Sequence, residues 1–293
     1  MDKSLTKYQK SLPYLLALIS VVIWGFNFVA AKVAVSGISP FLMLSLRFLI
    51  AFIILIPFYP KPPIPLKQIL IISFTFGFGH LGSMFLSLHM GLSSSVGIVA
   101  DKVGVPFAIL LAFLLFKEKP TIPEIIGIIF ALIGTFFLAQ SPTSIGHPVA
   151  FLLIIFSGFS WALYSVELKK FNSKSALGLV AWVSLFSFFI TLTLSLIFEE
   201  NQLQMIKNSN LNNWLALLYT AILASIVAHG IWGYLMTSQN INKIIPMTLL
   251  VPIFGVFGGV VFLGETLSES MILGSIIMVV GLKITFIKKR KSS

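Results

Sequence analysis

Long apolar stretches, separated by short polar breaks, fill almost the whole chain. Each stretch is close to the ~20 residues that a helix needs to cross a bilayer. None shows the inside–outside alternation in ten-residue segments that marks a membrane β-strand. The pattern therefore predicts an all-α membrane protein with ten transmembrane helices. The predicted spans are 13–34, 40–60, 66–91, 94–116, 121–140, 148–169, 176–198, 212–238, 243–263 and 268–287.

The composition supports a membrane protein and removes several kinds of chemistry. Of the 293 residues, 57% are hydrophobic and only 10% are charged, which is too apolar for a soluble fold of this size. The absence of cysteine excludes disulfides, thiolate metal sites and cysteine nucleophiles. The N-terminal MDKSLTKYQK resembles the basic start of a signal peptide, but no small-residue cleavage site follows it. We therefore expect an uncleaved first helix.

The net charge of +11 comes from bases in short loops between apolar runs, which is typical of cytoplasmic loops and not of a nucleic-acid surface. Of the 20 Lys and Arg residues, Arg47, Lys102 and Lys283 fall within spans. With the N-terminus inside, 15 of the others lie on the cytoplasmic side and two, Lys32 and Lys207, lie outside. The positive-inside rule thus predicts that both termini, including basic tails at 1–10 and 289–293, are cytoplasmic.

Two halves of the sequence repeat one pattern. WGFNFVAAK (24–32) is echoed by WALYSVELK (161–169). The segment that runs from the second half of span 4 through span 5 also matches the segment from span 9 through span 10. We predict repeats at 11–140 and 148–288. Each repeat has five spans, so the second must be inverted relative to the first, as in many secondary transporters. Other matched pairs are Pro106 and Pro252, Glu118 and Glu265, Gly127 and Gly274, and Gly134 and Gly281.

Three charges lie deep inside predicted spans, where each costs about 2.5–3.5 kcal/mol on insertion scales. They are Arg47, Asp101 and Lys102, and we expect them to face the bundle interior. One hypothesis is that Arg47 and Lys102 attract a substrate carboxylate, while Asp101 pairs with Arg47 or accepts the substrate ammonium. A zwitterionic amino acid would suit such a site. The alternative is a fixed Asp101–Arg47 bridge that only joins spans 2 and 4.

Further polar and aromatic residues at matching depths complete a candidate substrate site. His80 and His229 occupy corresponding spans, and a histidine can carry a proton at physiological pH, which leaves proton coupling open. Pro106 and Pro252 break backbone hydrogen bonds at equivalent places and are candidate gates. No nucleotide loop, metal-spaced cluster or catalytic set is present, so no cofactor is expected. The other candidate substrate-binding residues are Trp24, Asn27, Trp161, Tyr164 and Trp232.

These motifs resemble the EamA family of the drug/metabolite transporter superfamily. The resemblance rests on WGFNFVAAK, LMLSLRF (42–48), IVAHGIWGYL (226–235), LLVPIFG and LGETLS, and it runs from about residue 13 to 287. Within the family the chain is most similar to the cysteine/O-acetylserine exporter branch. The resemblance implies ten helices, a central cavity between the halves and export of amino acids or related metabolites. Asp101 and Lys102 depart from the Gln and small residues that this branch tends to carry in span 4.

We therefore expect a secondary transporter of the bacterial cytoplasmic membrane that exports amino acids or their derivatives by alternating access. One alternative is uptake of a larger metabolite, such as S-adenosylmethionine or a nucleotide derivative. An alternative of another class is a membrane-embedded enzyme in which a histidine and Asp101 act as acid and base. Monomer and dimer both remain open.

Overall fold

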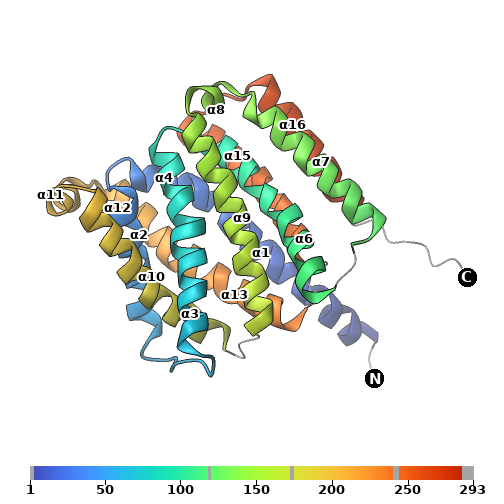
Figure 1. Ribbon diagram of the computed structural model, residues 1–293, viewed down its shortest axis with the longest axis horizontal. Coiled ribbons are helices and arrows are strands. Elements are labelled where there is room, and N and C mark those ends of the chain that lie inside the picture. The colour runs from blue at the N-terminus through green and yellow to red at the C-terminus, as the bar shows by residue number, and fades with distance from the viewer. Residues whose placement is uncertain (1–2, 118–119, 172–174, 240–243, 286–293) are drawn as a thin grey trace, which may run out of the picture.

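The computed structural model describes residues 3–117, 120–171, 175–239 and 244–285, and all regular structure within these ranges is helical. Glu118 and the tail at 289–293, both used in the sequence predictions, lie outside the described residues. The helices cross one another as a single bundle, with α7 and α16 side by side along one edge (Figure 1).

The first five helical stretches correspond to the first predicted repeat. Three of them are continuous α-helices, and two contain a π-helical or 3₁₀ segment. They are α1 (Lys3–Val35); α2 (Pro40–Leu55); α3 (Leu66–Ser73) with the π-helical η1 (Phe74–Gly82) and α4 (Ser83–His89); α5 (Ser94–Ala100) with the 3₁₀ turn η2 (Asp101–Val103) and α6 (Gly104–Phe116); and α7 (Ile122–Ala139).

The later stretches follow the same plan. They are α9 (Pro148–Phe171); α10 (Ala176–Phe198); α12 (Leu211–Leu218) with the π-helical η3 (Tyr219–Ala228) and α13 (His229–Ser238); the 3₁₀ turn η4 (Ile245–Leu250) with α15 (Val251–Leu263); and α16 (Glu269–Thr285). Two short helices in loops, α8 (Pro142–Gly146) and α11 (Gln202–Asn208), were not predicted. Within the described ranges, six helices are long and apolar enough to cross a membrane, and four shorter apolar helices accompany them.

Local sequence explains most helix ends. Helix α2 begins with Pro40 at its first position, where the missing N–H is harmless, and stops at Leu55, five residues before the end of the predicted span. Pro57 and Pro60 follow, and a proline disfavours helical backbone in the residue before it. The oxygen of Ser93 caps the start of α5 by accepting from the backbone N–H of Val96 at 3.2 Å.

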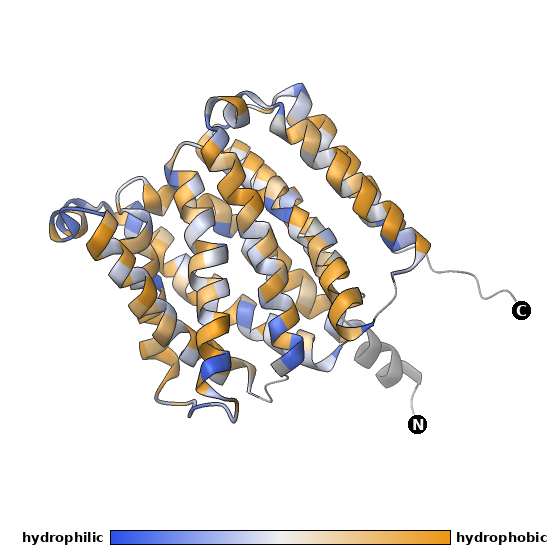
Figure 2. Ribbon diagram, viewed as in Figure 1, coloured by the Kyte–Doolittle hydropathy of each residue, from blue (hydrophilic) through white to orange (hydrophobic). Residues whose placement is uncertain are grey.

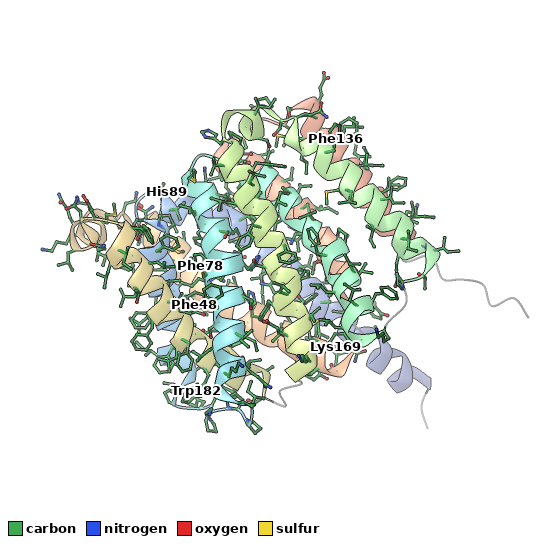
Figure 3. All side chains as sticks on the ribbon, viewed as in Figure 1. Phe48, Phe78, His89, Phe136, Lys169 and Trp182 are labelled. Carbon is green, nitrogen blue, oxygen red and sulfur yellow. The ribbon has the colours of Figure 1, made fainter. Side chains whose placement is uncertain are left out.

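The outer surface of the helices is largely apolar, and charged side chains are buried in the interior, which is the reverse of a soluble protein. Phe136 on α7 is 66% exposed, whereas Arg47 is fully buried and Asp101 is 2% exposed. Apolar residues cover the helices, and polar ones gather at the ends and at a few interior positions (Figure 2). Phe136 is labelled on the edge of the molecule in Figure 3. This distribution fits a surface that lipid covers.

Helices at corresponding places in the two predicted repeats pack on each other in two cases, α2 on α10 and α7 on α16. In addition, α1 packs on α15 as its counterpart α9 packs on α6, so each repeat's first helix meets the fourth stretch of the other repeat. Glu199, just after α10, accepts hydrogen bonds from the first N–H groups of α2, so these two helices run antiparallel. Gly134 of α7 lies against Gly274 and Met278 of α16, and Leu138 lies against Gly274, so this pair is antiparallel too. Two inverted copies of one unit would pack in this way.

Candidate functional site

Most of the predicted polar residues lie where a spanning helix departs from regular α-geometry. His80 is in the π-helical η1, Asp101 and Lys102 form the 3₁₀ turn η2, and His229 directly follows the π-helical η3. Such irregular turns are frequent at functional sites. Pro106 is the third residue of α6, directly after η2, and its ring removes a backbone donor at that break. Pro252 lies in the first turn of α15, after the 3₁₀ turn η4.

Asp101 is held by a chain of polar groups on three helices. Lys102 Nζ donates to Asp101 Oδ2 at 3.1 Å, and Ser157 Oγ donates to Asp101 Oδ1 at 2.9 Å. His80 Nδ1 lies 2.9 Å from Ser157 Oγ and 3.7 Å from Asp101 Oδ1. Because the Ser157 hydroxyl hydrogen points to Asp101, His80 Nδ1 is the donor to Ser157. Both oxygens of Asp101 therefore already accept hydrogen bonds.

The predicted alternative of an Asp101–Arg47 bridge is wrong. Within the described part of the chain the ion-pair partners of Asp101 are Lys102 and His80. Arg47 Nε instead donates to Ser225 Oγ at 2.8 Å. The long Lys102 side chain reaches back to its own neighbour, so the 100° between adjacent helical residues does not keep them apart.

Arg47 is a buried cation that forms no ion pair among the described residues. Its guanidinium carbon lies 5.7 Å from the centre of the Phe85 ring. The side chain is fully buried, and neither terminal nitrogen has a hydrogen-bond partner among the described residues. A buried donor without a partner costs about 1–3 kcal/mol, and more when it is charged. The fold therefore keeps an arrangement that stability alone does not favour.

A small polar cavity with about 30 Å³ of free space lies at the centre of these groups. Trp24 and Trp161 add aromatic walls. Asn27, 4% exposed, carries a side-chain oxygen with no hydrogen-bond partner in the described structure. Seven of the ten predicted substrate-binding residues line this cavity: Trp24, Asn27, His80, Asp101, Lys102, Trp161 and His229.

The other three predicted residues lie elsewhere. Tyr164 lines a second, mainly apolar cavity with about 20 Å³ of free space. Trp232 is fully buried and lies behind Trp24, with ring centres 5.0 Å apart. Arg47 lies behind Ser225, which lines the second cavity.

An aromatic partition separates the two cavities. Phe76 stacks on Tyr164 with ring centres 4.6 Å apart and meets the His229 ring edge-on at 4.7 Å. His229 lines both cavities. Its Nδ1 lies 2.5 Å from the Ala224 carbonyl oxygen and must donate to it, so Nδ1 cannot also accept from Trp24 Nε1 at 3.4 Å. Nε2 of His229 is thereby left as an acceptor.

Sequence analysis missed several of these residues. Ser157 is one of many serines in apolar helices, and its only signal is that it lies one turn before Trp161 on the same face. Phe76 is one of 28 phenylalanines and carries no local signal.

The capping role of two loop carboxylates was not predicted either. Glu265 accepts hydrogen bonds from the N–H groups of Ser94 (2.7 Å) and Ser95 (2.9 Å) at the start of α5. Glu199 does the same for the start of α2. Nearby, Lys32 Nζ donates to the carbonyl oxygens of Leu88 and Leu92.

The described residues show no cluster of three or more His, Cys, Asp or Glu side chains that could hold a metal ion. What the arrangement offers is recognition. Lys102 supplies a positive charge, Asn27 and the histidines supply neutral acceptors, and the tryptophans supply apolar walls. This is the usual make-up of a small-molecule site.

Comparison with known proteins gives one consistent picture. The EamA-like transporter family model matches residues 11–140 and 148–287. A Salmonella typhimurium protein named "Probable amino-acid metabolite efflux pump" is 31% identical over 278 residues, covering 92% of this chain and 93% of that protein. An Escherichia coli K12 protein of the same name is 29% identical over 277 residues, with the same coverage.

A solved crystal structure agrees in fold, with a TM-score of 0.69 at 17% sequence identity, covering 94% of this chain and 96% of that one. The family match, the apolar outer surface and the spanning helices give the same result. The chain is a multi-pass integral membrane protein and belongs to the EamA-like transporter family of the drug/metabolite transporter superfamily.

Proposed function

We propose that this protein is a secondary transporter that exports amino acids or closely related metabolites by alternating access. It would lie in a bacterial cytoplasmic membrane with both termini in the cytoplasm and would consist of two inverted repeats, 11–140 and 148–288. The names of the Salmonella and Escherichia coli relatives support a small metabolite as substrate and efflux as the direction.

The polar cavity carries the proposal. A buried ion pair, an unpartnered acceptor on Asn27 and two tryptophans surround an enclosed space within the helical bundle. A static scaffold would gain nothing from this arrangement, because buried polar groups without partners lower stability. A bound ligand that supplies the missing partners would explain why these buried polar groups are kept. Lys102 would attract the substrate carboxylate.

The second cavity supplies the approach from the cytoplasm. It is lined by Leu168 near the end of α9 and by Ala176 at the start of α10, which are cytoplasmic ends in the proposed orientation. Substrate would enter there and reach the polar cavity by displacing the partition of Phe76, Tyr164 and His229. Pro106 and Pro252, beside the two 3₁₀ turns, would allow the helices to bend as access changes.

Counterflow in liposomes tests the function. Purified protein is reconstituted with unlabelled amino-acid metabolites inside, and labelled substrate is added outside, with and without a pH gradient. A transporter accumulates the label in unchanged molecules, whereas an enzyme would yield a new compound. An exchange rate that depends on the pH gradient would establish proton coupling, and a rate that does not depend on it would exclude proton coupling.

Two variants test the site. We expect Lys102→Gln to abolish counterflow, because it removes the charge that attracts the carboxylate. Lys207→Gln, which removes an exposed lysine from α11, is the matched control and should transport normally. Normal counterflow by correctly inserted Lys102→Gln protein would refute the proposed site.

A further inference from the structure

The charges at the centre of the bundle do not balance. Arg47 and Lys102 are positive, and Asp101 is the carboxylate that faces the polar cavity. With both histidines neutral, as their donation to uncharged oxygens allows, the described centre carries one net positive charge. A ligand that enters the cavity without its own net charge leaves this imbalance in place.

Asp101 is poorly placed to receive a substrate ammonium. Its two oxygens accept from Ser157 and Lys102, and His80 lies close to one of them. An ammonium at Asp101 would have to share the carboxylate with the Lys102 ammonium, whose Nζ already lies 3.1 Å from Asp101 Oδ2. Two ammonium groups on one carboxylate repel each other where water is excluded. The zwitterion hypothesis from the sequence therefore lacks its anionic partner.

The unpartnered acceptor of the cavity is neutral and suits a different nitrogen. Asn27 Oδ1 has no hydrogen-bond partner in the described structure and is buried beside Trp24. An ammonium brings three N–H donors and a charge, whereas an amide nitrogen brings one N–H donor and no charge. One neutral acceptor satisfies an amide completely. Three charged donors would remain mostly unsatisfied there.

We infer that the cavity selects its substrate as an anion, binding the carboxylate by charge at Lys102 and a neutral nitrogen at Asn27. N-acylated amino acids have this chemistry, with an acyl group that Trp24 and Trp161 can cover. Free zwitterionic amino acids would be poorer substrates, and amines without a carboxylate would be excluded. This inference rests on the proposed function and narrows its substrate class.

A pair of isomers tests the inference in the wild-type protein. N-acetyl-L-serine is a monoanion and O-acetyl-L-serine is a zwitterion of the same atoms, so size is matched. Counterflow is measured at about pH 6, where the free amine is protonated and acyl transfer between the isomers is slow. L-serinamide serves as the cation. We expect N-acetylserine to exchange about tenfold faster than O-acetylserine, and serinamide not to exchange.

Asn27→Asp tests the same reasoning by a gain of function. The new carboxylate balances the central charge and offers an anionic partner to an ammonium, so the preference should shift to O-acetylserine. Lys207→Gln, remote from the cavity, should keep the wild-type ratio.

Each outcome is decisive. Equal or faster exchange of O-acetylserine by wild-type protein overturns the inference and leaves the proposed function standing. Exchange of serinamide overturns it as well. No exchange of any amino-acid metabolite by folded protein overturns the proposed function and the inference together. The ratio of the N-acetylserine and O-acetylserine exchange rates is measured on the wild-type protein. The inference can therefore be overturned even if the Asn27→Asp protein misfolds.

Discussion

Replacing Arg47 by methionine should make the protein more stable and less active at once. Arg47 is fully buried, its two terminal nitrogens have no partner among the described residues, and its one hydrogen bond goes to Ser225. Methionine fills a similar volume without a charge. Exchanging buried charges for well-packed apolar residues is often neutral or stabilising by about 1–4 kcal/mol.

The magnitude follows from the contacts. Two unsatisfied donors at about 1–3 kcal/mol each give a penalty of about 4 kcal/mol that the substitution removes. Loss of the charged hydrogen bond to Ser225 costs about 2 kcal/mol and offsets half of this gain. Ser225 keeps a partner, because its hydroxyl also donates to the Thr220 carbonyl oxygen at 3.1 Å. We expect Arg47→Met to raise the free energy of unfolding by about 2 kcal/mol.

Unfolding by sodium dodecyl sulfate in mixed micelles, followed by circular dichroism, measures the change in free energy, and liposome counterflow measures transport. Arg47→Lys is the control. It keeps an unpaired buried charge and should show no gain in stability. A loss of 1 kcal/mol or more in Arg47→Met would refute the reasoning, since it would mean that the guanidinium is well satisfied. Unchanged transport would remove Arg47 from the function.

Three further substitutions test other contacts. Glu265→Gln weakens a charge-assisted cap and should destabilise the start of α5 by about 1–2 kcal/mol. A cysteine introduced at Met84 of the cysteine-free protein should then react faster with an impermeant thiol reagent. An unchanged labelling rate would contradict the capping role. Ser157→Ala leaves one oxygen of Asp101 without its hydroxyl donor, while His80 Nδ1 keeps the Ser157 carbonyl oxygen at 3.2 Å, and it should lower the free energy of unfolding by about 1–3 kcal/mol. A neutral effect in detergent unfolding would show that water replaces the hydroxyl. Pro106→Ala restores a backbone donor beside η2 and should slow counterflow without destabilising the protein; wild-type transport would mean that the break is static.

Sequence patterning predicts the helices well, because lipid forces every backbone polar group into helical hydrogen bonds. Most helical stretches begin and end near the predicted boundaries; α1 begins at Lys3, ten residues before the predicted span, and the early end of α2 follows from Pro57 and Pro60. The interruptions are harder to foresee. Pro106 indicates the 3₁₀ turn at Asp101–Val103, but no proline marks the π-helical stretch that holds His80.

The partners of the buried side chains could not be predicted from the sequence as well as the helices could. Asp101 had Arg47, Lys102 or a histidine within reach, and the choice depends on the rotation of each helix about its axis. That rotation is weakly specified when a helix such as α6 is apolar on nearly every face. Ser157 completes the polar chain from a different half of the sequence, so no local pattern connects it to Asp101.

The two carboxylate caps bear on how tightly the membrane stays sealed. Glu199 and Glu265 both belong to the second half of the chain, and each fastens the first turn of a first-half helix. Breaking both caps, at about 1.5 kcal/mol each, costs about 3 kcal/mol. If these helix ends must separate when the protein opens, the caps lower the population of the open form about 150-fold in the absence of substrate. An idle carrier built this way would leak little of the ion gradients on which the cell depends.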